Sequence, residues 1–200
     1  MKGTWNTRYT GTEFIYGTEP NQFLKYELSK INSGKILFLG EGEGRNAVYA
    51  ATLGWDVDAV DFSASGKLKA DKLAAEKGVK INYCVEDLST YTPKQNYYNA
   101  VVLIYLHLEE ELREKVNQKA SAALKPDGRI IMEVFEKEQI KNSSGGPKSI
   151  ELLYSLQNIV EDFIDLDFEK LSKETIDLSE GEYHKGRAIV IRFVGVKPQG

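Results

Sequence analysis

Short apolar runs alternate with amphipathic segments along most of this chain. The apolar runs have the length and composition of buried strands, and they cover residues 35–40, 55–61, 79–85, 98–105 and 129–135. Before and between them lie segments with apolar residues at helical spacing, which cover residues 20–31, 44–53, 64–77 and 109–124. Strands that alternate with helices predict a parallel sheet covered by helices on both faces.

Proline, serine and glycine residues mark the ends of these segments. Pro20 stands at the start of a predicted helix, where proline is favoured. Ser63 is a candidate cap for the helix that follows it, and Gly54 and Gly78 stand where glycine commonly ends a helix. The KPDG sequence at 125–128 predicts a turn before the fifth strand.

The last third of the chain departs from this alternation. Residues 136–148 have no apolar periodicity and predict a mobile loop, which is followed by a helix over 149–161. Two β-like runs then follow, FEKLSKETIDL and GRAIVIRFVGV, joined by SEGEYHK. Two such runs with a short connection predict an antiparallel hairpin at the end of the chain.

Length and charge restrict the class of protein. Two hundred residues suit a single domain with a full core. The formal net charge of −4 disfavours a broad basic surface for nucleic acid. No apolar stretch approaches the roughly 18 residues of a membrane span, and the first ten residues lack the apolar centre of a signal peptide. We therefore expect a cytoplasmic protein that binds neither nucleic acid nor a membrane.

The single cysteine, Cys84, excludes an internal disulfide and suits a reducing compartment. It lies in the apolar run INYCV, which predicts a buried structural thiol and not a nucleophile. One cysteine and two histidines provide no zinc-type cluster. We expect no metal site.

The most informative segment is KILFLGEGEGRNAVYAA at 35–51. Its apolar run stops at Gly40, and Gly42 and Gly44 follow before a helix begins. Glycines allow a sharp turn and a close approach of the backbone to a ligand, which then faces the first amides of the helix. The next strand ends in Asp61, whose carboxylate is suited to hold the two hydroxyls of a ribose. These features predict a cofactor that contains adenosine.

The spacing of the glycines bears on which cofactor this is. The dinucleotide fingerprint G-x-G-x-x-G/A requires a small residue at its last position. Arg45 occupies that position here, so the spacing is G-x-G-x-G instead. This spacing resembles the first motif of the class I S-adenosylmethionine (SAM) methyltransferases.

Other segments extend this resemblance over nearly the whole chain. VEDL at 85–88 is similar to the adenine-contacting segment of the family, and YNAVVLIYLHLEEELREKV is similar to its fourth motif and the helix that follows. LKPDGRIIMEVF resembles the approach to the fifth strand. The opening WNTRYTGTEFIYGTEPNQFL and the closing EGEYHKG resemble the small-molecule branch, the tellurite-resistance and thiopurine methyltransferase-like group. The chain departs from the common pattern at Phe38, where many members carry an acid.

The resemblance implies a fold and an activity. The fold is α/β, a Rossmann-like and mostly parallel seven-stranded sheet with an antiparallel C-terminal strand and helices on both faces. One domain would span 1–200, with an N-terminal lid and helix (1–31), a cofactor-binding core (35–135), and a substrate-side loop, helix and hairpin (136–200). The activity is transfer of methyl from SAM to a small nucleophile, such as a thiol, a thiopurine or a selenium or tellurium oxyanion.

Several residues are candidates for holding SAM. Gly40, Glu41 and Gly42 would bring main chain against the zwitterionic methionine portion. Asp61 would accept hydrogen bonds from the ribose hydroxyls, although a solvated acid at a strand end is the alternative. The candidate set also includes residues of the lid, of the helix after the glycines and of the next strand ends: Tyr16, Asn46, Phe62, Glu86, Asp87, Leu88 and Ile104.

Some of these candidates have a second interpretation. Phe62 packs on the adenine or belongs to the core. Either Asp87 or Glu86 accepts a hydrogen bond from the adenine amino group, and Asp87 is also suited to cap the turn after it. Arg45 is either an exposed cation or a contact for a carboxylate of cofactor or substrate.

The N-terminal segment is rich in aromatic residues, namely Trp5, Tyr9, Phe14 and Tyr16. Such a cluster either covers an apolar groove or forms a lid whose rings favour a sulfonium cation. By the resemblance it is a lid over cofactor and substrate, and Tyr16 is its best candidate residue.

Catalytic candidates lie where strands meet loops. His107 follows the fourth strand at the carboxyl edge, where open α/β sheets bind ligands, and His184 lies in the terminal hairpin. Either imidazole is suited to deprotonate an acceptor near neutral pH, and Tyr105 is a third candidate. We expect Tyr16, His107 and His184 to converge on one pocket, closed by the lid, the fourth strand's end, the 136–148 loop and the hairpin.

Two other classes of function remain open at this point. An NAD-type oxidoreductase uses a similar layout for adenosine, but Arg45 and the terminal hairpin count against it. A non-catalytic SAM-binding regulatory module is the other alternative, because methyltransferases of this class often need no protein base. The expected partner is a small methyl acceptor, whose identity the residues do not determine, and they do not determine the oligomeric state.

Overall fold

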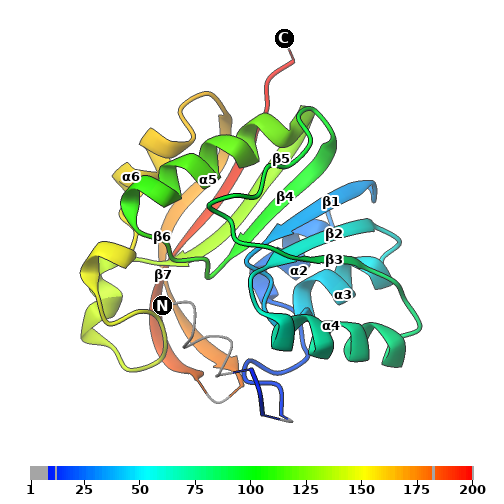
Figure 1. Ribbon diagram of the computed structural model, residues 1–200. Helices are drawn as coiled ribbons and strands as arrows, with labels where there is room; N and C mark the ends of the chain where they lie inside the picture. The colour runs from blue at the N-terminus through cyan, green and yellow to red at the C-terminus, as the bar shows by residue number, and fades with distance from the viewer. Residues whose placement is uncertain (1–8, 12, 182, 200) are drawn as a thin grey trace.

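The computed structural model describes residues 9–11, 13–181 and 183–199 and contains one seven-stranded sheet (Figure 1). The strand order is β3-β2-β1-β4-β5-β7-β6. The strands are β1 (Lys35–Leu39), β2 (Asp56–Asp61), β3 (Asn82–Val85), β4 (Tyr98–Ile104), β5 (Leu124–Phe135), β6 (Asp167–Glu180) and β7 (His184–Val196). Strands β1 to β5 are parallel to one another, whereas β7 lies antiparallel between β5 and β6. The predicted fold class is confirmed.

Helices cover both faces of this sheet. They are α2 (Gln22–Leu28), α3 (Arg45–Thr52), α4 (Ala64–Glu76), α5 (Glu110–Ala123) and α6 (Leu156–Asp162), with short 3-10 helices η1 (Lys137–Lys141) and η2 (Ile150–Leu152). Apolar side chains of α2, α3 and α4 belong to the core on one face, and those of α5 and α6 to the core on the other (Figure 1). The chain therefore crosses from one side of the sheet to the other after β4.

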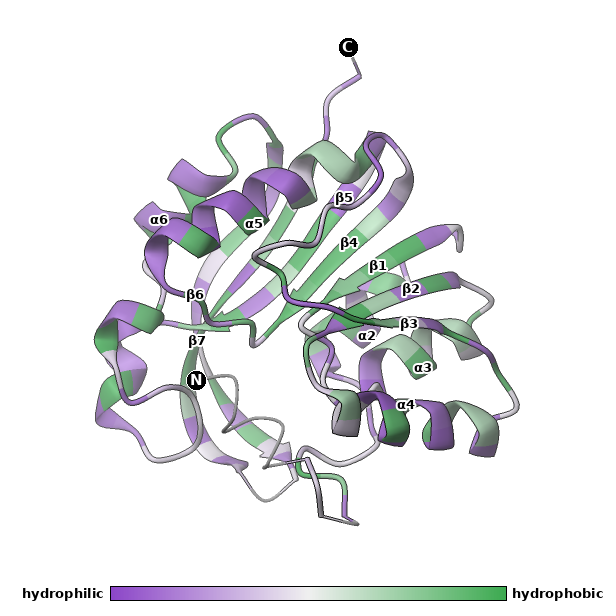
Figure 2. Cartoon of the chain, in the orientation of Figure 1, coloured by the Kyte–Doolittle hydropathy of each residue, from purple (hydrophilic) through white to green (hydrophobic). Residues whose placement is uncertain are grey.

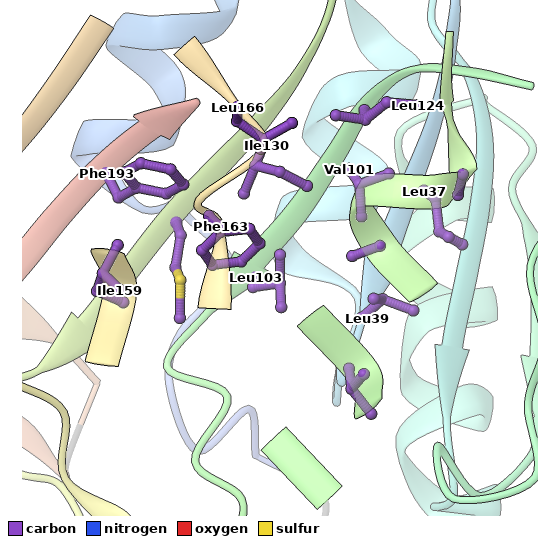
Figure 3. Packing of buried hydrophobic residues seen from close by; sticks show 14 of the residues in the cluster. Leu37, Leu39, Val101, Leu103, Leu124, Ile130, Ile159, Phe163, Leu166 and Phe193 are labelled. Carbon is purple, nitrogen blue, oxygen red and sulfur yellow. The ribbon is translucent and has the colours of Figure 1, made fainter. Parts of the chain in front are cut away.

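The central strands are buried on both sides, which explains why they read as continuous apolar runs. In β1, Leu37 and Leu39 pack toward α5, whereas Ile36 and Phe38 pack toward α2 and α3. Figure 3 shows Leu37 and Leu39 beside Val101 and other members of the first of these cores. Figure 2 shows hydrophobic residues along the central strands and many hydrophilic residues on α5 and α6.

The expectation that Cys84 is buried is wrong. Cys84 is exposed, because β3 is the edge strand of the sheet and only Tyr83 among its residues is buried. β3 is also shorter than predicted and begins at Asn82. An edge strand is covered on fewer sides than a central one, a difference that a short apolar run does not reveal.

The segment after β5 is more structured than its polar sequence suggested. Residues 136–148 contain η1, whose Gln139 is buried and accepts a hydrogen bond at 2.8 Å from the backbone N–H of Ile189 in β7. The helix predicted over 149–161 begins only at Leu156, after η2. The KPDG turn is absorbed into a bent β5, where Asp127 has a φ of 61°.

Membrane-spanning helices and clusters of metal ligands are both absent from the residues that the structure describes. None of its helices is long and apolar enough to cross a membrane. Within the same residues, no group of three or more histidine, cysteine, aspartate or glutamate side chains is placed to hold a metal ion.

Candidate functional site

A cavity of about 1040 Å³ lies at the carboxyl ends of the parallel strands. This volume is slightly above the range of roughly 300–1,000 Å³ that is typical of small-molecule sites. Of the residues predicted to form the site, all but Gly42 and Glu86 line the cavity: Tyr16, Gly40, Glu41, Asn46, Asp61, Phe62, Asp87, Leu88, Ile104, Tyr105, His107 and His184. The structure therefore brings the glycine turn, the lid residue and both histidines to one place.

The glycine turn folds back against the end of β2. The backbone N–H groups of Gly40 and Glu41 both donate to the carbonyl oxygen of Val60. Gly40 and Gly42 have φ values of 70° and 64°, in the left-handed region that favours glycine. A Cβ on Gly40 would lie 2.7 Å from Leu106 Cδ1, so this glycine also permits close packing at the end of β4.

Glu41 caps the helix that follows the turn. Gly44 at the N-cap has no side chain, and Oε1 of Glu41 accepts hydrogen bonds from the backbone N–H groups of Asn46 and Ala47, at 2.9 and 2.8 Å. Its remaining exposed surface faces the cavity. Burial of the carboxyl group raises the pKa of Glu41 to about 8, although these two hydrogen bonds oppose the shift.

Asp61 is a buried residue, 7% exposed, and the alternative of a solvated strand-end acid is wrong. Its Oδ2 accepts a hydrogen bond from the backbone N–H of Gly42 at 3.1 Å, and its Oδ1 accepts one from that of Ser63 at 2.8 Å. Burial raises the pKa of Asp61, and the two hydrogen bonds oppose that shift. Each carboxylate oxygen can accept a further hydrogen bond, so Asp61 can brace the turn and still meet a hydroxyl.

Residues from the neighbouring strand ends line the cavity beside the glycine turn. Phe62, Leu88 and Ile104 give it an apolar surface. Asp87 also lines the cavity, and its Oδ1 accepts a hydrogen bond from the backbone N–H of Ser89 at 2.8 Å. The capping role of Asp87 is therefore present, and it does not remove the residue from the cavity.

Arg45 is not the exposed cation of one earlier interpretation, because only 7% of the residue is exposed. Its Nη2 lies 2.7 Å from Oε2 of Glu180 at the end of β6. Its Nη1 donates to the carbonyl oxygens of Tyr16 and Glu19, both at 3.3 Å. The residue that breaks the dinucleotide fingerprint thus ties the lid segment (residues 13–19) to the terminal hairpin.

A second set of contacts holds the lid segment to the glycine turn. Oε2 of Glu43 accepts a hydrogen bond from the backbone N–H of Ile15 at 2.9 Å. Lys69 donates to Oε1 of Glu43 at 2.6 Å and to the carbonyl oxygen of Glu13 at 2.5 Å. Trp5, the first aromatic residue of the predicted lid, lies outside the described residues.

His107 does not have the free nitrogen that a proton acceptor needs. The backbone N–H of Phe135 donates to Nε2 at 3.3 Å, so Nδ1 carries the hydrogen and donates to the carbonyl oxygen of Leu152 at 2.7 Å. Burial lowers the pKa of His107 to about 4. The imidazole lines the cavity, but it joins β4, β5 and the η2 segment as a structural group.

Tyr105 is also held in place by the protein. It has a φ of 53° at the end of β4, and its hydroxyl donates to Oε1 of Glu133 at 2.6 Å. Burial, together with the charge of Glu133, raises the pKa of Tyr105 well above its usual value. The phenol is therefore a hydrogen-bond donor to a carboxylate and is unsuited to be a base.

Glu133 and Glu180 contact residues that line the cavity, and the sequence analysis missed both of them. Glu133 is fully buried in β5 and also receives hydrogen bonds from Asn21 Nδ2 and Arg192 Nε, both at 2.6 Å. A single acid inside the apolar run IIMEVF was the signal that could have identified it. Glu180 lies in a polar strand, where one more acid gives no signal.

His184 is the first residue of β7, and its ring packs among three aromatic rings. The ring centroids of Tyr16, Tyr105 and Phe135 lie 4.4, 4.6 and 5.3 Å from that of His184. Its Nδ1 lies 3.4 Å from Oε2 of Glu180. Burial lowers the pKa of His184, although the interaction with Glu180 opposes the shift.

The chain is similar to known methyltransferases in sequence and in fold. A family model described as a methyltransferase domain matches residues 36–128, which contain the glycine turn, Asp61 and β4. A search of curated proteins finds no match. The match at 36–128 is therefore a similarity to a methyltransferase domain over the part of the chain that carries the glycine turn.

Solved structures share the fold at low sequence identity. A SAM-dependent methyltransferase from Methanosarcina mazei superposes with a TM-score of 0.71 and 13% identity, covering 88% of this chain and 98% of that one. TehB from Haemophilus influenzae superposes with a TM-score of 0.74 and 16% identity, and the match covers 96% of this chain and 65% of that one. The [4+2]-cyclase SpnF superposes with a TM-score of 0.70 and 14% identity, and the match covers 100% of this chain and 93% of that one.

Proposed function

We propose that this chain is a SAM-dependent methyltransferase, which transfers the methyl group to a small-molecule nucleophile bound in the same cavity as the cofactor. The observation that carries the proposal is the lining of that cavity. The glycine turn and Asp61 line one part of it, and Tyr16 and His184 line another. At about 1040 Å³ it has the volume for a nucleoside cofactor and a small second ligand.

The residues on the cofactor side fit the chemistry of SAM. Asp61 offers carboxylate oxygens that are already oriented by Gly42 and Ser63, as the ribose hydroxyls require. Phe62 and Leu88 offer apolar surface for a base, and Asp87 offers a hydrogen-bond acceptor beside them. These assignments rest on position in the cavity and on the resemblance to the family.

SAM supplies an activated methyl group on a sulfonium, so the chain has to bind, orient and exclude water. The lid segment is suited to exclude water from the cavity, because Glu43, Lys69 and Arg45 hold its backbone over the glycine turn. Tyr16 lies in this segment and lines the cavity. Its ring is suited to stabilise a cation beneath the lid.

A small acceptor fits the site better than a macromolecule. The lid segment, the loop that carries Gly145 and Gly146, and the hairpin with His184 all line the cavity, so they restrict the space around an acceptor. The low-identity match to TehB is in line with the small-molecule branch. A thiol, a thiopurine or a selenium or tellurium oxyanion is the acceptor class that this branch suggests. The cytoplasmic location remains a prediction.

A non-methylating binding protein is the second candidate function. Its support is the similarity to SpnF, which is described as a [4+2]-cyclase. A protein with this fold can therefore have a function other than methyl transfer. The oxidoreductase interpretation has less support. Arg45 holds the lid segment at the position where the dinucleotide fingerprint needs a small residue.

Calorimetric titration with SAM, S-adenosylhomocysteine and NAD tests the proposal. We expect saturable binding of the first two and none of NAD. A panel of small thiols, thiopurines, selenite and tellurite should then show methyl transfer to at least one acceptor. Binding of SAM with no turnover on any acceptor would favour the binding protein, and binding of NAD alone would overturn the proposal.

A further inference from the structure

The two histidines of the cavity differ in which nitrogen is open to it. Both nitrogens of His107 are taken by backbone groups. In His184, Nδ1 alone has a hydrogen-bond partner among the residues that the structure describes, and this partner is Glu180. Among the described residues, no fully buried side-chain nitrogen or oxygen lacks a hydrogen-bond partner. Because Nε2 of His184 has none, it is not fully buried, and the cavity that His184 lines is the space it faces.

Glu180 is an ionised carboxylate beside this ring. Burial alone would raise its pKa, but the hydrogen bond with His184 and the charge of Arg45 lower it to about 2. Arg45 Nη2 lies 2.7 Å from Oε2, and Asn21 Nδ2 donates to Oε1 at 3.2 Å. A carboxylate only accepts hydrogen bonds, so the hydrogen of a neutral His184 must be on Nδ1.

Beside Nε2, glycine residues line the cavity together with His184. Gly145 lies beside that edge of the ring, and a Cβ there would lie 2.7 Å from Cδ2 and 3.2 Å from Nε2 of His184. Gly145 has a φ of 135°, and neither it nor Gly146 carries a side chain that would cover the nitrogen. The ring cannot turn freely, because Tyr16, Tyr105 and Phe135 pack around it.

We infer that Glu180 is a positioning residue that holds His184 as the Nδ1–H tautomer, so that Nε2 accepts the proton that a methyl acceptor loses. This inference rests on the proposed function. As the heteroatom of the acceptor bonds the methyl carbon, the carbon–sulfur bond breaks and its electron pair stays on sulfur. The proton of the heteroatom moves to Nε2, and the resulting imidazolium, stabilised by Glu180, returns it to solvent.

Charged and titratable groups on the surrounding elements decide when His184 can act. Glu180 and Glu133 favour the protonated ring, whereas burial and Arg45 disfavour it. The rings of Tyr16 and Tyr105 also pack against it, and His107 lies in the same cavity. The balance leaves the imidazole neutral at pH 7, with the Nε2 lone pair available.

Nitrogen-15 NMR of the histidine side chains in the free protein tests the tautomer directly. We expect His184 to be neutral and protonated on Nδ1 at pH 7. In Glu180→Met the Nε2–H tautomer should become populated and the pKa of His184 should fall. Glu174→Met is the matched control, because Glu174 lies on the same strand and pairs with Arg192, away from His184. If Glu180→Met does not fold, the double variant Arg45→Met/Glu180→Met takes its place, because it also removes the cation that the loss of Glu180 would leave unpaired.

Kinetics with 2-mercaptoethanol as the acceptor probe add a second readout. His184→Asn should lower kcat about 10²- to 10⁴-fold, which is the usual contribution of a base. Glu180→Met should lower kcat at least about tenfold. In both variants the Kd for SAM should change by less than about threefold. A wild-type His184 protonated on Nε2, or equal tautomer populations in Glu180→Met and Glu174→Met, would overturn the inference. Failure of the wild type to bind SAM would instead overturn the proposed function, since the NMR experiment needs no cofactor.

Discussion

Arg45 Nη2 lies 2.7 Å from Glu180 Oε2, and this ion pair joins the start of α3 to the end of β6. The two side chains are 8% and 11% exposed, so the pair is buried. The backbone of the lid segment passes over the same guanidinium and accepts two of its hydrogen bonds. One contact therefore connects the glycine turn, the lid segment and the terminal hairpin.

Arg45→Met should destabilise the protein strongly, because it leaves the carboxylate of Glu180 buried without its cation. Breaking a buried pair in this way costs about 3–5 kcal/mol. Urea unfolding measures the loss. Lys67→Met is the matched control, since Lys67 forms an exposed pair with Asp71 that is worth no more than about 1 kcal/mol. Equal losses in the two variants would show that the Arg45 pair does not hold these segments together.

Asp61→Ala should weaken SAM binding by about 1.5–3 kcal/mol, the range for a hydrogen bond to a charged group. It should also lower the free energy of unfolding by about 1–3 kcal/mol, because the N–H groups of Gly42 and Ser63 lose their acceptor. Calorimetry and urea unfolding measure the two effects.

Asp56→Ala is the control for the Asp61 variant. Asp56 begins the same strand, and its side chain is 75% exposed. It should leave SAM affinity unchanged. An unaltered Kd in folded Asp61→Ala would refute the ribose assignment.

Gly42→Ala should reduce SAM binding because the added methyl group would press against Tyr9, which precedes the lid segment in the sequence. A Cβ on Gly42 would lie 2.8 Å from the Tyr9 hydroxyl, and Tyr9 lines the cavity. Gly78→Ala is the control, because Gly78 has a similar φ of 69° but open space around its Cβ. Both variants should lose about 1–2 kcal/mol of stability from backbone strain. Only the first should lose affinity, and a normal Kd in folded Gly42→Ala would count against this arrangement.

His107 should make stability fall as the pH falls below about 6.5. The unfolded chain binds a proton with the usual pKa of 6.5, whereas the folded protein binds it only near pH 4. The unfolded state therefore takes up more protons between these values, so up to about 3 kcal/mol present above pH 6.5 is lost as the pH falls toward 4.

Urea unfolding at pH 7.5 and pH 5 checks this prediction. His107→Gln should show a smaller difference in the free energy of unfolding between the two pH values than the wild type. His107→Gln should also be less stable at pH 7.5, because the N–H of Phe135 loses its acceptor. The same pH dependence in both proteins would mean that His107 is not the group responsible.

Local features of the sequence determined the fold and the part of the cavity that the glycine turn and Asp61 line. A central strand is apolar because both of its faces are buried, so Ile36 to Leu39 identify β1 without reference to any other residue. Gly40 and Gly42 are needed for backbone angles that other residues avoid, and this requirement is also local. Asp61 could be identified because it directly follows an apolar run. Such features survive in a single sequence because neighbouring residues produce them.

Only the tertiary structure decided what the polar side chains do. His107 and His184 look alike in sequence. Both nitrogens of His107 form hydrogen bonds, with the carbonyl of Leu152 and the N–H of Phe135, whereas Glu180 contacts Nδ1 of His184 and leaves its Nε2 open. The same holds for Arg45, whose partner is far away in the chain. A hydrogen bond or an ion pair depends on a few ångströms between segments that only folding brings together. Residue type and local spacing therefore do not reveal the partner or the free nitrogen.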